Sequence, residues 1–222
     1  GNYPYQSIID GYNNGTDTNW LDLVTQNAFI RNTNVSVSGS SEKNSYFLSA
    51  GHTEQDGYVK NDKYSRMNLR ANFENRTRDW ITIGMETALS MGDHSGIKAD
   101  LRLGNLYSPL IAPYNENGTL ATDPIGVDRN PLLPTEIDQL DKRLNLFGNF
   151  HATIKLPVDG LSYKINHGIS YRTQRDYRFD PNGNNFTGIA SKYNSYTIDR
   201  TTDNLLTYTK TFNDKHALDA TL

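Results

Sequence analysis

The sequence predicts an all-β fold: a transmembrane antiparallel β-barrel, of which these 222 residues form an internal portion of about eight strands. Three observations predict it. Apolar and polar residues alternate along several segments, most of these segments hold roughly ten residues or more, and the connections between them are short and long in turn. Successive side chains on a strand point to opposite faces, so each segment has one apolar and one polar face. Roughly ten residues is the length that a tilted strand needs to cross a bilayer, whereas soluble strands average about five or six.

The expected strands are 28–38, 44–54, 64–75, 80–91, 143–156, 161–175, 196–212 and 217–222. In the first four, the apolar face carries Val35 and Val37, then Tyr46, Leu48 and Ala50, then Met67, Leu69, Ala71 and Phe73, then Ile81, Ile83, Met85 and Leu89. In the fifth and sixth, it carries Leu144, Leu146, Phe150, Ala152 and Ile154, then Leu161, Tyr163, Ile165, Ile169 and Tyr171. The opposite face is strongly polar, with Arg66, Asn68, Arg70, Asn72 and Glu86 among its members. Such a face suits either a solvated surface or the wet lumen of a membrane barrel.

The connections support the membrane alternative. Four are tight turns rich in Gly, Asn, Asp and Pro, at 39–43, 75–79, 157–160 and 213–216. Three are long, at 54–63, 92–142 and 174–195. Alternation of the two classes places every short turn at one end of the sheet, as in outer-membrane barrels.

Aromatic residues follow the same geometry. Tyr46, Phe73, Tyr163 and Phe212 lie close to short turns and have the parity of the apolar face, which predicts an aromatic belt at one membrane interface. The alternative is that aromatics simply favour strands. Arg31 and His167 disagree with the pattern, because both have the parity of the apolar face.

Composition excludes several other classes. No apolar run approaches the roughly 18 residues of a membrane helix, and a net charge of −3 is too weak to indicate a nucleic-acid partner. Without cysteine there is no disulfide scaffold, and the five histidines show no ligand spacing, so no metal and no cofactor is expected. Walker, GxGxxG and GxSxG motifs are missing, and the sequence therefore predicts no enzyme. Both ends look cut, and we expect an internal piece of a longer chain that opens with an irregular lead-in at 1–27.

The connection at 92–142 is the best candidate for recognition. A loop of about 50 residues inside a compact fold is usually functional or disordered, and its apolar content argues for order. Tyr107 and Tyr114 offer flat surfaces for a sugar ring or a peptide, and are the predicted substrate-binding residues. The alternative is a variable insertion without ligand contact.

Several motifs resemble the SusC/RagA-like TonB-dependent outer-membrane transporters. They are Asn-Val-Ser-Val-Ser-Gly-Ser-Ser-Glu-Lys-Asn-Ser-Tyr-Phe-Leu-Ser from 34, Gln-Asp-Gly-Tyr-Val-Lys-Asn from 55, Tyr-Ser-Arg-Met-Asn-Leu-Arg-Ala-Asn-Phe from 64 and Asp-Trp-Ile-Thr-Ile-Gly from 79. Thr-Asn-Trp-Leu-Asp-Leu-Val from 18 is similar to the segment that precedes this hairpin in the family. The resemblance is dense over 17–91, thinner over 143–222 and absent from the long loops.

The resemblance implies a barrel of about 22 strands, plugged by an N-terminal domain, that imports oligosaccharides or peptides across the bacterial outer membrane. It also implies a SusD-like surface lipoprotein as partner, and TonB as a partner reached through a region before Gly1. Two alternatives remain: a soluble extracellular carbohydrate-binding β-sandwich, and a complete eight-stranded structural barrel.

Overall fold

The computed structural model describes residues 6–125, 129–183, 187–213 and 215–222. Eight strands form one antiparallel sheet in sequence order. They are β1 (Phe29–Ser40), β2 (Asn44–Asp56), β3 (Lys63–Arg78), β4 (Ile81–Asp93), β5 (Asp138–Lys155), β6 (Leu161–Asp180), β7 (Ile189–Phe212) and β8 (His216–Thr221). Every expected strand is present, and the all-β prediction is confirmed.

The strands that flank the long connections extend further than their sequence pattern indicates. β5 begins at Asp138 rather than 143, β6 continues to Asp180 rather than 175, and β7 begins at Ile189 rather than 196. The extensions carry charged residues on both faces, so they lack the alternation that reveals a half-buried strand. The longest connection is accordingly 94–137.

Short helices occupy the segments expected to be irregular. They are α1 (Gln6–Asn14), α2 (Trp20–Val24), α3 (Leu101–Leu106) and the 3₁₀ helix η1 (Leu133–Glu136). Asn19 caps α2 by accepting from the backbone N–H of Asp22 at 3.2 Å, and Asp100 caps α3 by accepting from Leu103 at 2.9 Å. Helices of five to nine residues are too short to show a clear periodicity, so the sequence did not indicate the two helices that residues 6–27 contain. None of the helices in the described ranges is long and apolar enough to span a membrane.

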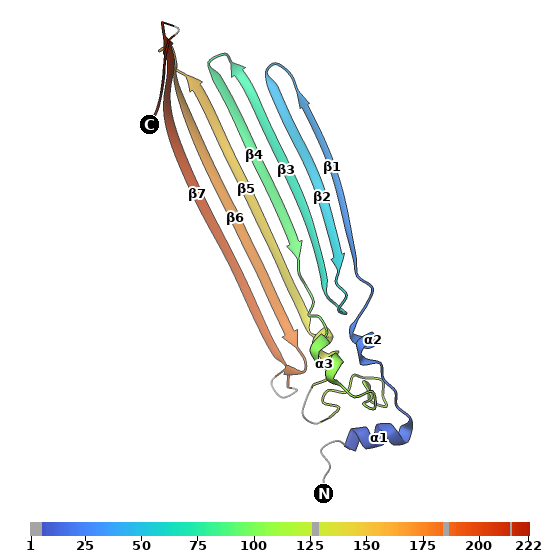
Figure 1. The fold of residues 1–222 in the computed structure, drawn as a ribbon. Helices are drawn as coiled ribbons and strands as arrows, with labels where there is room; N and C mark the ends of the chain where they lie inside the picture. Colours follow the sequence, from blue (N-terminus) through green and yellow to red (C-terminus); the bar gives the residue numbers. More distant parts are fainter. Residues whose placement is uncertain (1–5, 126–128, 184–186, 214) are drawn as a thin grey trace.

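The sheet is a single curved layer with two different ends (Figure 1). The tight turns β1–β2, β3–β4, β5–β6 and β7–β8 all lie at one end, and the helices lie with the long connections at the other. In the described part of the chain, β1 and β8 are the two edges of the sheet. The complete eight-stranded barrel is therefore not what these residues form.

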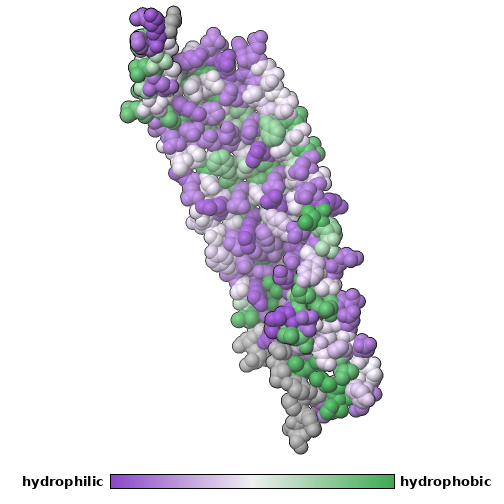
Figure 2. Space-filling model, viewed as in Figure 1, coloured by the Kyte–Doolittle hydropathy of each residue, from purple (hydrophilic) through white to green (hydrophobic). Residues whose placement is uncertain are grey.

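The strand register sorts the side chains into two faces. One row of partners runs Val35, Ala50, Leu69, Leu89, Leu146, Tyr171, Ile198 from β1 to β7. The adjacent row, one residue away, runs Asn34, Gly51, Asn68, Ser90, Asn145, Arg172, Thr197. We call the sides that carry these rows the apolar face and the polar face. Figure 2 shows a view in which hydrophilic residues prevail along the strands.

The apolar face is open. Val35, Leu48 and Ile83 on it are exposed, and the described residues contain no second sheet to cover it. A soluble β-sandwich would pack this face against another sheet at about 10 Å. The sandwich alternative is therefore wrong, and a face of uncovered aliphatic side chains is what a membrane wall presents to lipid.

Two of the exceptions on the apolar face have partners. Arg31 pairs with Glu54, which lies directly opposite on β2 near the helix-bearing end of the sheet. The ring nitrogen Nδ1 of His167 lies 2.8 Å from the hydroxyl of Thr202. Arg200, also on this face, is a further exception that the sequence pattern did not single out.

The strand register places two of the four residues of the expected aromatic belt next to each other. Tyr46 lies directly opposite Phe73, and both rings are exposed on the apolar face. Tyr46 also covers Gly39 on β1, where a Cβ would lie 2.6 Å from the phenol oxygen. The common height of Tyr46, Phe73, Tyr163 and Phe212 stays a prediction.

Candidate functional site

In the part of the chain that the structure describes, the buried apolar core lies outside the sheet, in a unit that we call the cap, formed by residues 6–27, 57–62, 94–125 and 129–137. Trp20, Leu103, Tyr107 and Ile111 form one buried cluster, and Val24, Val59, Ala99 and Leu132 form a second. These residues come from the lead-in, the β2–β3 connection and the β4–β5 connection. Three segments far apart in sequence therefore fold together over the end of the barrel wall (Figure 1).

Close backbone contacts hold the cap helices together. A Cβ at Gly11 of α1 would overlap the carbonyl oxygen of Leu110, and one at Gly104 of α3 would lie 2.7 Å from a methyl of Val24. The indole N–H of Trp20 donates to the Ser108 carbonyl at 3.1 Å. Glycine at these two positions lets the helices approach more closely than any other residue would.

The cap is also joined to the sheet. The backbone N–H of His94 donates to Asp141 at 2.8 Å and that of Gly96 donates to Gln139 at 3.2 Å, which extends the β4–β5 pairing into the connection. Asn182, after β6, donates to Glu136 at 3.0 Å. The described parts of the long connection are thus hydrogen-bonded to β5 and to a residue that follows β6.

The polar face below the cap carries a shallow trough of about 330 Å³. Its polar lining comes from β1 to β6 and includes Asn34, Ser49, Asn68, Arg70, Ser90, Asn145 and Arg172. Amide and hydroxyl groups both donate and accept hydrogen bonds, so this row can bind the polar groups of a passing solute.

The cations of this face fall into two groups. Arg143 makes two hydrogen bonds to Asp141, at 3.2 and 2.7 Å, and Arg172 pairs with Asp199 at 2.7 Å. Arg66 and Arg70, both on β3, form no ion pair within the described ranges and are exposed. Two unpaired guanidinium groups on one wetted strand can each bind a carboxylate or a phosphate in a two-pronged manner.

The two predicted substrate-binding tyrosines occupy different environments. Tyr107 is only 8% exposed; its ring packs edge-on against Trp20 at 5.1 Å, and its hydroxyl donates to the Arg129 carbonyl at 2.9 Å. Tyr114 is 46% exposed on a small hairpin, where Ala121 donates to Pro113 and Asn115 donates to Thr119. In this structure Tyr107 supports the cap, and only Tyr114 presents its ring outward.

Sequence reasoning did not single out Val59 or the Asp141–Arg143 pair. Nothing in the sequence around Val59 indicated that this residue would be buried, because its partners are distant in sequence. The Asp-x-Arg spacing at 141–143 was a readable signal, since residues two apart on a strand share a face.

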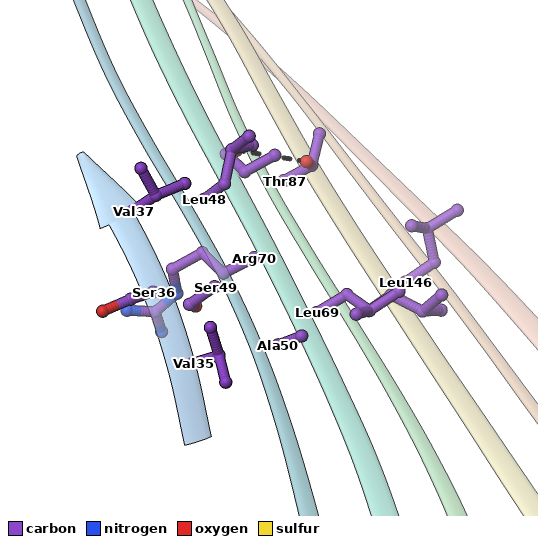
Figure 3. Close-up of a pocket in the computed structure, with 12 residues that line it drawn as sticks. Val35, Ser36, Val37, Leu48, Ser49, Ala50, Leu69, Arg70, Thr87 and Leu146 are labelled. Atoms are coloured by element: carbon purple, nitrogen blue, oxygen red, sulfur yellow. Dashed lines mark hydrogen bonds between the residues drawn. The ribbon is translucent and has the colours of Figure 1, made fainter. Parts of the chain in front are cut away.

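A hollow of about 530 Å³ belongs to the other face (Figure 3). Small side chains at Ala50 and Ala71 lie among Val35, Leu48, Leu69 and Leu146, and leave a shallow depression. The hydroxyl of Thr87 donates to the Ala71 carbonyl at 3.1 Å, which satisfies the polar group in this apolar setting. Because its walls are aliphatic and face outward, the depression fits lipid contact better than solute recognition.

A sheet with one lipid-facing and one wetted surface, capped at the end opposite its tight turns, defines the wall of a large outer-membrane β-barrel. A search of protein-family models gives no match. The chain is 25% identical to TonB-dependent receptor P3 of Formosa agariphila over 93% of its length, and 27% identical to TonB-dependent receptor P39 of that organism over 89%. It spans only 22% and 20% of those two relatives, about a fifth of their length.

Solved structures agree on the fold. The chain superimposes on the structure of the RagAB peptide transporter with a TM-score of 0.73, covering 93% of this chain and 25% of that one at 22% identity. For the RagAB peptide importer in its open-open state the TM-score is 0.74, over 92% of this chain and 24% of that one. The sequence motifs and these comparisons agree: the chain resembles TonB-dependent receptors in sequence and part of the RagAB peptide transporter in fold.

Proposed function

We propose that this chain forms part of the barrel wall and the outward surface of a TonB-dependent transporter that imports a nutrient across the bacterial outer membrane. The strands of the wall lie within residues 28–222, a portion of a barrel of about 22 strands, and two of the connections between them belong to the cap. The observation that carries the proposal is the continuous polar row from Asn34 to Thr197 on a sheet whose other face is uncovered. The chain lines a substrate path and performs no chemistry of its own.

Peptides are the substrate class that the polar face favours. Arg66 and Arg70 are placed to bind the carboxylates of peptide termini or acidic side chains. The solved neighbours, described as a peptide transporter and a peptide importer, support this choice. Oligosaccharides are the second candidate, because the row of Asn and Ser side chains matches sugar hydroxyl groups.

The cap is the surface that we assign to a SusD-like lipoprotein. Tyr12, Tyr58 and Leu106 are exposed on it although they are large and apolar, which is typical of an interaction surface. Tyr114 belongs to the same unit and is available either to this partner or to the substrate. TonB would act through a region that lies outside this chain.

The test of the polar face replaces Arg66 and Arg70 by glutamine in the full-length transporter. Removing a charge-assisted hydrogen bond costs about 1.5–3 kcal/mol, so uptake of an acidic peptide at limiting concentration should fall roughly tenfold or more. Arg31→Gln, on the apolar face, is the matched control and should leave uptake unchanged. Equal uptake by the double variant and the wild type would assign recognition to another part of the transporter.

The test of the cap compares the two tyrosines. Tyr114→Ala should weaken uptake or partner binding about tenfold while the cap remains folded, because its ring contacts solvent rather than the core. Tyr107→Ala should instead loosen the cap, since it opens a cavity beside Trp20. Binding assays with the purified partner, together with hydrogen exchange, separate the two effects. Unchanged uptake and unchanged partner binding in Tyr114→Ala would remove Tyr114 from the recognition surface.

A further inference from the structure

A second groove lies on the apolar face, at the border between its aliphatic residues and the charged strand ends below the cap. It has a volume of about 520 Å³ and runs across β4, β5 and β6. Met91 and Leu144, which are direct strand partners, form its apolar side. Lys142 and Arg175, also direct partners, form its charged side one row nearer the cap.

The charges in this groove are unbalanced. Lys142 lies 3.5 Å from Asp93, which offsets its charge in part. Arg175 is exposed and has no ion-pair partner within the described ranges. The residue directly opposite it is a second cation, Lys142. Like charges directly opposite each other on neighbouring strands destabilise a sheet. An anion placed between the two side chains would remove that repulsion.

The neighbouring row adds to the positive character. Lys192 lies over the ring of Tyr177 at 4.7 Å, and Tyr177 itself lines the groove. Asp138, the next carboxylate on this face, is further along β5, at its first residue. Near the groove, the apolar face therefore carries three cations, Lys142, Arg175 and Lys192, and one carboxylate, Asp93.

The apolar side of the groove continues toward the middle of the sheet. The next row holds Leu89, Leu146 and Tyr171, all on the apolar face. A molecule with an anionic head and a hydrocarbon tail would place its head on the cations and its tail along these residues. In the transporter proposed above, this border lies at the membrane surface on the side of the cap.

We propose that this groove binds a phosphorylated lipid of the outer leaflet, with a phosphate between Lys142 and Arg175 and an acyl chain along Met91 and Leu144. The proposal rests on the proposed function, because it needs the apolar face to lie in a membrane. Guanidinium and ammonium groups both bind phosphate through charge-assisted hydrogen bonds. The site would anchor the barrel wall to the leaflet from which the cap projects.

The test uses the full-length transporter in detergent, with lipid A as the probe and native mass spectrometry to count bound lipid. The combined variant Lys142→Gln, Arg175→Gln should bind lipid A about tenfold more weakly than the wild type. Arg175→Lys should keep most of the binding, because it retains the charge. Arg31→Gln, a cation of the same face that already has a carboxylate partner, is the matched control and should bind like the wild type.

Three results would overturn the lipid site. The combined variant could bind lipid A as tightly as the wild type, phosphatidylcholine could bind as well as lipid A, or inorganic phosphate could bind alone with the affinity of lipid A. The last result would indicate an ion site without a lipid. Absence of the transporter from the outer-membrane fraction would instead contradict the proposed function, so the two failures are distinguishable.

Discussion

Trp20→Ala should unfold the cap while the strands remain paired. Trp20 is 3% exposed, packs against Tyr107 and donates to Ser108, so its truncation leaves a large cavity in a small core. Such a change costs about 3–5 kcal/mol. Cap stability is local, and we therefore expect amide hydrogen exchange across 99–107 to accelerate roughly a hundredfold or more, with β2 to β6 unchanged.

The chain supplies its own control for this experiment. Trp80, its only other tryptophan, is 54% exposed at the tight turn between β3 and β4. Trp80→Ala should leave exchange in the cap at the wild-type rate. If Trp20→Ala also left it unchanged, the lead-in would not be part of the folded cap, and the clusters around Trp20 and Val24 would have to be reassigned.

Leu146→Arg should destabilise the barrel by about 2–4 kcal/mol, whereas Phe147→Arg should cost far less. The two residues are neighbours on β5 with similar exposure, 40% and 46%, but they lie on opposite faces. Arginine at 146 would face hydrocarbon, and arginine at 147 would face the polar side beside Ser170. The measurement is the unfolding free energy of the full-length transporter in lipid vesicles, with its outer-membrane level as a second readout.

The pair of variants tests the assignment of the faces directly. If Phe147→Arg destabilised the barrel and Leu146→Arg did not, the lumen side and the lipid side would be the reverse of those assigned here. Tolerance of both would mean that this sheet does not lie in a membrane. Because the two positions are adjacent on β5 and the introduced side chain is the same, differences in local strand propensity contribute little.

Local patterns in the sequence were sufficient to predict the strands of the wall and their two faces. Alternation along β3 and β4 gave both faces, and the tight turns gave each hairpin its register. The same rule could have found the Asp141–Arg143 and Arg178–Asp180 pairs, each two residues apart on one strand. By contrast, the ion pair between Arg172 and Asp199 depends on the register across the long β6–β7 connection.

The cap shows where such patterns fail. Its helices are too short for periodicity, and the partners of Val24 and Trp20 come from connections on either side of the hairpins. The apolar content of the long connection favoured order, and its described residues include α3, η1 and members of the two buried clusters. It ranked Tyr107 and Tyr114 alike, because residue type does not reveal which ring is buried.

The two faces of the wall and the layout of its turns follow from the sequence alone, because the alternation of a strand is visible in neighbouring residues. The different places of Tyr107, which supports the cap, and Tyr114, which projects from it, became visible in the folded structure. The start of β5 at Asp138 rather than 143 places Lys142 opposite Arg175, next to Met91 and Leu144. The charged extension of β5 shows no alternation, and the packing of Tyr107 depends on segments far apart in the chain, so neither arrangement has a local signature in the sequence.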